Sequence, residues 1–104
     1  MAAGNGFAVI YRWQVDPEHE QYFLERWHSG TLRLKRDFGA MGSCLTRAAN
    51  GDFIAFARWP SEAARERAFA AIQPVEPWPG IRSFEETKLW VEDDQLTGGL
   101  TGGD

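Results

Sequence analysis

A strand pattern passes straight into the start of a helix in the stretch Phe7-Ala-Val-Ile-Tyr-Arg-Trp-Gln-Val-Asp-Pro17. Apolar and polar residues alternate through its first part, as they do in a strand with one buried face. Asp16 is then a favoured helix N-cap residue, Pro17 fits the first helical position, and Glu18 suits the positive end of the helix dipole. The sequence therefore predicts a strand followed directly by a helix.

A long helix and a hairpin follow this junction. Apolar residues at three- and four-residue steps predict a helix over residues 16–38, and Gly39 is placed to end it. Strands are predicted over residues 43–49 and 52–59. Between them, Asn50-Gly51 is the strongest short signal for a two-residue hairpin turn. These elements extend the predicted order to β-α-β-β.

A second helix and a final strand complete the pattern. Ser61 is a favoured N-cap for a shorter helix, which Pro74 ends. A Pro-rich loop over residues 74–80 then leads to a last strand over residues 84–91. The order β-α-β-β-α-β predicts an α+β, ferredoxin-like (split βαβ) fold, in which two helices cover one face of a four-stranded antiparallel sheet.

Length and composition indicate one small domain. The chain has 104 residues, of which 43% are hydrophobic, enough for a single core. We expect a flexible N-terminus over residues 1–6, the folded domain over residues 7–94, and a flexible Gly-rich tail over residues 95–104. No segment has the pattern of a membrane span or a signal peptide. With the single Cys44, this predicts a cytoplasmic protein without disulfides.

The composition also argues against several classes of function. The formal net charge is −4, which disfavours sequence-independent binding to the phosphates of nucleic acids. Histidines and the cysteine are not clustered at metal-ligand spacing, and no Gly-rich phosphate loop is present. We therefore expect no metal, no nucleotide cofactor, no nucleic acid partner and no membrane partner.

The predicted hairpin turn sets which side chains share a face of the sheet. With Asn50-Gly51 as the loop, Ala49 pairs with Asp52. The helix-covered face then receives Cys44, Thr46 and Ala48 together with Phe53, Ala55, Ala57 and Trp59. The uncovered face receives Ser43, Leu45, Arg47, Ile54, Phe56 and Arg58, beside Ile10 and Arg12.

This uncovered face predicts a homodimer. Its large apolar members are Ile10, Leu45, Ile54 and Phe56. Burying each such side chain contributes about 1.5–3 kcal/mol, so two sheets gain by pairing face to face, and contiguous apolar surface usually marks a partner site. Scattered apolar residues on the surface of a monomer are the alternative.

The covered face predicts a hollow between the sheet and the long helix. Large side chains of the first strand, Tyr11 and Trp13, lie near the small Ala55 and Ala57 of the third strand. Trp27, Trp59 and Thr46 extend the walls, and Trp78 in the Pro-rich loop either packs on the core edge or serves as a lid over the mouth. Such a hollow suits a flat, oxygen-bearing aromatic ligand. A filled aromatic core, with Trp78 packed on its edge, is the alternative.

One stretch of the third strand is the most specific in the chain. It reads Ile54-Ala-Phe-Ala-Arg-Trp-Pro-Ser61 and runs directly into the second helix. Together with residues 7–17, Phe23, Trp27 and residues 38–47, it resembles the antibiotic biosynthesis monooxygenase (ABM) domain family of the dimeric α/β-barrel superfamily. The resemblance spans about residues 7 to 94. It implies a homodimer whose two sheets face each other, with a separate cavity in each subunit.

The resemblance also implies an activity. Members of the family oxygenate aromatic phenols or quinols with O₂ and without metal or flavin, and one branch degrades haem. Trp59 matches the third-strand Trp that both branches carry in the cavity. Tyr11 stands where the haem branch has Asn, and the second helix has no His in place of that branch's iron ligand. Ala55 stands where some quinol oxygenases have Asn.

These residues together predict a cofactor-independent monooxygenase acting on a small phenol, quinol or polyketide-type substrate. We expect Trp59 and Tyr11 to be catalytic. The residues expected to bind the substrate are Trp13, Trp27, Thr46 and Trp78. A non-catalytic binder of small aromatic molecules and a non-oxidative polyketide-modifying enzyme are alternatives. An RNA-binding module has the same element order, but such modules stack bases on exposed aromatics in a basic setting, and the predicted open face offers only Phe56.

Overall fold

The computed structural model describes residues 6–72 and 77–96, and it confirms the predicted α+β, ferredoxin-like class. The elements are β1 (Phe7–Val15), the 3₁₀ turn η1 (Pro17–His19), α1 (Glu20–Phe38), β2 (Gly42–Arg47), β3 (Phe53–Trp59), α2 (Glu62–Ala71) and β4 (Ile81–Trp90). The predicted stop at Pro74 and most of both predicted tails lie outside the described residues.

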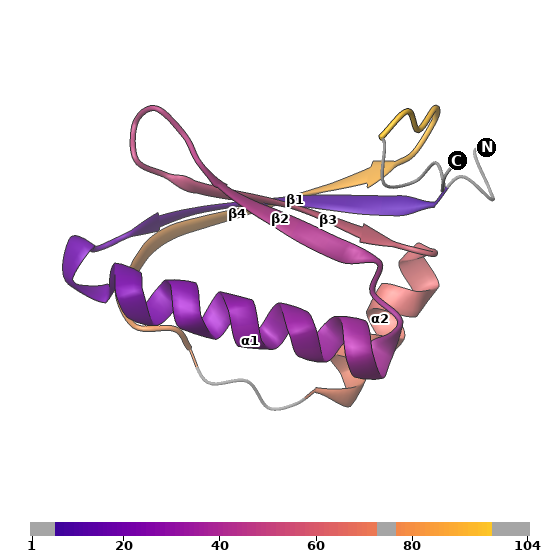
Figure 1. The fold of residues 1–104 in the computed structure, drawn as a ribbon, viewed down its shortest axis with the longest axis horizontal. Coiled ribbons are helices and arrows are strands. Elements are labelled where there is room, and N and C mark those ends of the chain that lie inside the picture. Colours follow the sequence, from indigo (N-terminus) through magenta and orange to yellow (C-terminus); the bar gives the residue numbers. More distant parts are fainter. Residues whose placement is uncertain (1–5, 73–76, 97–104) are drawn as a thin grey trace.

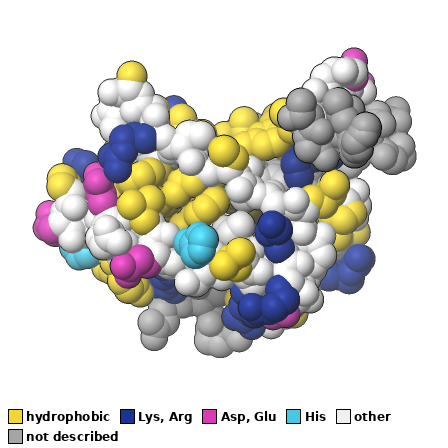
Figure 2. Space-filling view, in the orientation of Figure 1, with side chains coloured by type: hydrophobic (Ala, Val, Ile, Leu, Met, Phe, Trp, Pro, Cys, Tyr) yellow, Lys and Arg dark blue, Asp and Glu magenta, His cyan; other side chains and the backbone are white. Residues whose placement is uncertain are grey.

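The four strands form one antiparallel sheet in the order β2-β3-β1-β4. Figure 1 shows the sheet nearly edge-on, with α1 and α2 both below it and no helix above it. The segment that follows β4 rises over one end of the upper face. In Figure 2, hydrophobic side chains lie along this upper side, between the β2–β3 hairpin and the segment after β4.

Local residues account for the start of both helices and for the end of α1. The predicted Asp16 cap is absent, because the Asp16 carboxylate pairs with Arg82 at 2.9 Å, and the 3₁₀ turn Pro17–His19 precedes α1. Gly39 ends α1 with a φ of 80°, a left-handed conformation that glycine adopts without strain. Ser61 caps α2 as predicted, since its hydroxyl accepts the Ala64 N–H at 3.1 Å.

The hairpin loop is one residue longer than the sequence predicted. The Ala48 N–H donates to the Asp52 carbonyl at 2.8 Å, and the Gly51 N–H donates to the Ala48 carbonyl at 2.9 Å. The loop therefore holds three residues and ends on Gly51 at a φ of 97°, a common hairpin geometry. Asn50 is used differently from the prediction, because its side chain accepts the Asp52 N–H at 3.0 Å.

The extra loop residue reverses the two faces of β2, because side chains alternate along a strand. Ala55 pairs with Leu45 and Ile54 pairs with Thr46. The prediction that Ser43, Leu45 and Arg47 lie on the uncovered face is therefore wrong, as is the placement of Cys44 and Thr46 on the covered face. The faces assigned to β1 and β3 are correct, since β3 is buried at every second residue.

The core lies between the sheet and the two helices. One cluster joins Phe7, Val9, Trp59 and Ala68, and a second joins Val15, Phe23 and Phe53. Leu45 packs against the second cluster, as its corrected face requires. None of the helices in the described part of the chain is long and apolar enough to cross a membrane.

Candidate functional site

A cavity of about 970 Å³ lies on the helix-covered side of the sheet. Five of the residues predicted to form the site line it: Tyr11, Trp13, Trp27, Trp59 and Trp78. Thr46 does not, because the corrected register turns it to the uncovered face, where its hydroxyl donates to the Ile54 carbonyl at 2.7 Å. Ser43 of β2 reaches the lining instead.

Aromatic rings support one another along the walls. Tyr11 and Trp13 stack at 5.6 Å between ring centroids, and Trp13 meets Phe23 edge-on at 5.1 Å. Trp78 also packs edge-on against Phe23, at 5.3 Å, with the Arg26 guanidinium 4.9 Å from its ring. Trp78 therefore packs on the core edge and lines the cavity at once. Flat apolar walls of this kind match a flat aromatic ligand.

The polar part of the cavity centres on Tyr11. The Tyr11 hydroxyl oxygen accepts two hydrogen bonds from Arg65 on α2, one from Nε at 3.2 Å and one from Nη2 at 3.0 Å. Arg65 Nη2 also lies 3.2 Å from Glu86 Oε1. Glu86 pairs directly with Tyr11 across the β1–β4 ladder. A phenol, a guanidinium and a carboxylate therefore form one hydrogen-bonded group on the cavity wall.

Burial keeps the Tyr11 hydroxyl protonated, because it raises the pKa of Tyr11. The hydrogen bond and charge of Arg65 lower that pKa by less, and the charge of Glu86 raises it further. The phenol is therefore protonated at neutral pH and able to donate a hydrogen bond. Arg65 is only 7% exposed, and a buried guanidinium needs the partners that it has here.

Sequence reasoning missed both Arg65 and Glu86. Arg65 shares a helical stripe with Ala68, Phe69 and Ile72, at steps of three, four and seven residues, so the periodicity of α2 would have placed it inward. Glu86 gave no such signal, because it lies within an almost wholly exposed strand. Its position follows only from the pairing of β4 with β1.

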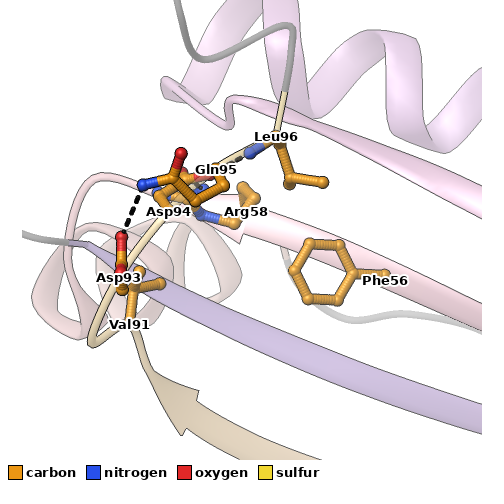
Figure 3. A pocket seen from close by; sticks show the side chains of 7 residues that line it. All are labelled: Phe56, Arg58, Val91, Asp93, Asp94, Gln95 and Leu96. Atoms are coloured by element: carbon orange, nitrogen blue, oxygen red, sulfur yellow. Dashed lines mark hydrogen bonds and ion pairs between the residues drawn. The ribbon is translucent and has the colours of Figure 1, made fainter.

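A smaller hollow of about 510 Å³ lies on the uncovered side, where the segment after β4 approaches β3 (Figure 3). Arg58 forms an ion pair with Asp94 there, and the Leu96 N–H donates to Asp94 Oδ1 at 3.0 Å. Phe56 forms part of the lining. These contacts attach the segment after β4 to one corner of the uncovered face.

Three possible ligand groups also meet at the start of α1. Ligand atoms of Asp16, Glu18 and His19 lie within 4.8 Å of one another. Asp16 is already paired with Arg82 at 2.9 Å. Acidic groups at a surface commonly cluster without an ion, so we assign no metal site here.

Solved structures with the same fold include three proteins of known or named activity. A mutant of SnoaB, a cofactor-independent oxygenase from Streptomyces nogalater, superposes with a TM-score of 0.70 and 15% identity over 89% of this chain and 99% of that one. ActVA-Orf6, a monooxygenase from Streptomyces coelicolor in complex with nanaomycin D, superposes with a TM-score of 0.63 and 17% identity over 88% of this chain and 92% of that one. MhuD, a heme-degrader from Mycobacterium tuberculosis with two hemes bound, superposes with a TM-score of 0.64 and 18% identity over 85% of this chain and 97% of that one.

Sequence comparison gives no match, either to a family model or to a curated protein. At identities of 15–18% the structural matches establish a shared fold. They include both oxygenases and a heme-degrading protein. The predicted resemblance is confirmed at this level: the chain has the fold of the antibiotic biosynthesis monooxygenases.

Proposed function

We propose that this protein is a monooxygenase that adds oxygen from O₂ to a small phenol, quinol or polyketide-type substrate without metal or flavin. The observation that carries the proposal is the cavity of about 970 Å³, walled by tryptophans and supplied with the Tyr11 hydroxyl. Its presence in a fold shared with SnoaB and ActVA-Orf6 supports the same reading. Trp59 and Tyr11 are the proposed catalytic residues, and Trp13, Trp27 and Trp78 the proposed binding residues.

The geometry suggests how such a reaction would run. The substrate ring lies against Trp27 and Trp59, and its oxygen accepts a hydrogen bond from Tyr11 or from the Trp59 indole. The deprotonated ring passes electrons to O₂ in a site shielded from water. For an anthrone, one oxygen atom forms the new carbonyl and the other leaves as water, with all four electrons supplied by the substrate CH₂ carbon. The balance requires no external reductant.

We also propose a homodimer through the uncovered face. After the register correction its half-buried apolar side chains are Ile10, Ile54, Phe56 and Leu89. Arg12 and Arg58 lie on the same face. The hydrophobic side chains visible above the sheet in Figure 2 support a partner at this surface.

Oxygen uptake tests the proposed activity. The purified protein is screened with a panel of anthrones and quinols, with and without a metal chelator, against a no-protein control for autoxidation. We expect uptake above the control for at least one compound, an oxygenated product, and no effect of the chelator. Chelator-sensitive uptake would contradict the cofactor-free mechanism, and product without uptake would favour a non-oxidative enzyme.

A non-catalytic binder of small aromatic molecules is the second candidate. The residue that favours it is Ala55, which pairs with Tyr11 in the sheet and is fully buried. The family that the sequence resembles includes oxygenases with Asn at this position, and Ala has no polar group to offer a substrate. Tight binding of the panel compounds with no turnover would establish this second reading.

A further inference from the structure

Arg65 is a buried cation whose charge the proposed reaction does not yet use. It is 7% exposed, comes from α2, and faces the cavity beside Phe69, with its guanidinium carbon 4.8 Å from that ring. Two of its nitrogens bind the Tyr11 oxygen, at 3.2 and 3.0 Å. An aliphatic side chain at this position would fill the space without the need to compensate a buried charge.

The two hydrogen bonds decide what Tyr11 offers to a ligand. A phenol oxygen has two lone pairs and one proton. Arg65 occupies both lone pairs, so only the O–H remains to make a contact. Within residues 6–72 and 77–96, no acceptor receives a hydrogen bond from it. Since burial raises the pKa of Tyr11, the proton is present at neutral pH.

The charged residues that line the cavity favour an anion there, since Arg26, Arg33 and Arg65 are cations and Glu86 is the one carboxylate among the described lining residues. Arg65 donates to the Tyr11 oxygen itself, and Glu86 offsets part of its charge from 3.2 Å. Glu66 lies 4.0 Å from Arg65 Nη1 and is 59% exposed, where water screens it. Lys88 binds Glu62 and Glu66, at 3.2 and 3.7 Å. A hydrogen bond from a phenol supported by a guanidinium stabilises an oxygen anion more than a neutral oxygen.

We propose that Arg65 is a positioning residue that holds Tyr11 as a hydrogen-bond donor toward the cavity, so that the site binds its aromatic ligand as an oxygen anion, a phenolate or enolate, in preference to the neutral form. This inference rests on the proposed function and names its substrate class. Binding of the anion from solution, with its proton left in the water, would supply the deprotonated substrate that the oxygenation requires. The same arrangement disfavours aromatic ligands without an ionisable oxygen.

A coloured phenol tests the inference without turnover. The probe is 4-nitrophenol, which titrates near neutral pH and absorbs visible light only as the anion. Tryptophan fluorescence first measures its binding, and absorbance then gives the pKa of the bound probe. In the wild-type protein we expect the anion to bind about tenfold more tightly than the neutral phenol, which lowers the pKa of the bound probe by about one unit.

Variants separate positioning from packing. Arg65→Met and Tyr11→Phe should each abolish the shift in the pKa of the probe, and Arg65→Lys should retain part of it. Arg36→Met is the matched control, since Arg36 is exposed on α1 and pairs with Asp37. Lost packing alone would weaken both forms of the probe equally and leave its pKa shift unchanged. Circular dichroism checks that each variant folds.

The outcomes distinguish this inference from the function on which it rests. Binding with an unshifted probe pKa, or an equal shift in wild type and Arg65→Met, would overturn the inference and leave the aromatic site in place. An absence of binding to the wild-type protein would overturn both. Binding with a lowered probe pKa that disappears in Arg65→Met and Tyr11→Phe but survives in Arg36→Met supports the inference.

Discussion

The two faces of the sheet are built from the same two central strands but are buried very differently. On the helix-covered face, Val9, Ala55 and Trp59 are at most 1% exposed. On the other face their neighbours Ile10, Ile54 and Phe56 are only half-buried. The covered face holds the cavity, and the uncovered face carries arginines among its apolar residues. One face is therefore complete within this chain, and the other is suited to a partner.

Because of this difference, substitutions on the two faces should change different properties of the protein. Changes on the uncovered face should alter association and leave the cavity in place. Changes on the covered face should alter ligand chemistry or stability. A substitution that affects the wrong property would show that a face has been misassigned.

The largest effect is expected from Phe56→Lys on the uncovered face. The substitution places a charge without a partner in the proposed dimer interface, and we expect the dimer Kd to rise by at least about 1,000-fold. Sedimentation at micromolar protein concentration measures the result. Leu32→Lys is the matched control, because Leu32 is 47% exposed on α1, and it should leave the dimer intact.

The oligomeric state of the wild-type protein tests the dimer proposal directly. A stable interface buries more than about 1,200 Å² in total, and the wild type should sediment as a dimer under the same conditions. A wild-type monomer would contradict the proposal, and the half-buried Ile10, Ile54 and Phe56 would then belong to a monomer surface.

The next effect concerns Trp59 on the covered face. Trp59→Phe keeps an aromatic ring but deletes the indole N–H. If that group stabilises charge that develops in the reaction, turnover of a verified substrate should fall by about 100-fold while binding changes little. Stopped-flow or steady-state kinetics with a separate binding titration distinguish the two. Equal turnover in both proteins would remove Trp59 from the mechanism and favour the binding reading.

The sequence was sufficient for the fold and for most of the cavity because each depended on local signals. The Asp16-Pro17 junction, the Ser61 cap and the alternation of β3 each act within a few residues. The hairpin register failed because Asn50-Gly51 is compatible with both a two-residue and a three-residue loop. In the structure the loop is tied to Asp52, which binds Asn50 within the loop and Arg12 of β1 on the uncovered face, at 2.7 Å, and the second contact is distant in sequence.

The hydrogen-bonded set of Tyr11, Arg65 and Glu86 in the cavity could not be predicted for the same reason, because contacts distant in sequence bring it together. Tyr11, Arg65 and Glu86 come from three different elements. Tyr11 was found from its strand face, but its partners are fixed by the packing of α2 and by the β1–β4 register. Arginine and glutamate are usually solvated, so composition gave no reason to place them at a site.

The corrected register makes a third prediction, smaller than the first two. Leu45 packs against Val15, Phe23 and Phe53, so Leu45→Ala should lower the free energy of unfolding by about 2 kcal/mol, near the low end for a partly buried leucine. Thr46→Ala removes one exposed hydrogen bond and should cost about 0.5–1 kcal/mol. Urea unfolding measures both. The reverse order would restore the register that the sequence predicted.

The smallest effect is a pH dependence at the hairpin itself. Burial raises the pKa of Asp52, but hydrogen bonds from Arg12 and Asn50 and the Arg12 charge outweigh it, so the pKa lies below its usual range. The stability that this carboxylate contributes is therefore complete above its unfolded pKa of about 3.9 and is lost as the pH falls through the lower folded value. Asp52→Asn should lower the Tm at about pH 6, and the difference in Tm from the wild type should close below about pH 4.

Asp37→Asn is the control for this prediction, since Asp37 also pairs with an arginine but its side chain is 43% exposed against 10% for Asp52. It should change the Tm less at every pH, and a gap for Asp52→Asn that stays constant into acid would show that the Arg12 pair does not hold the loop.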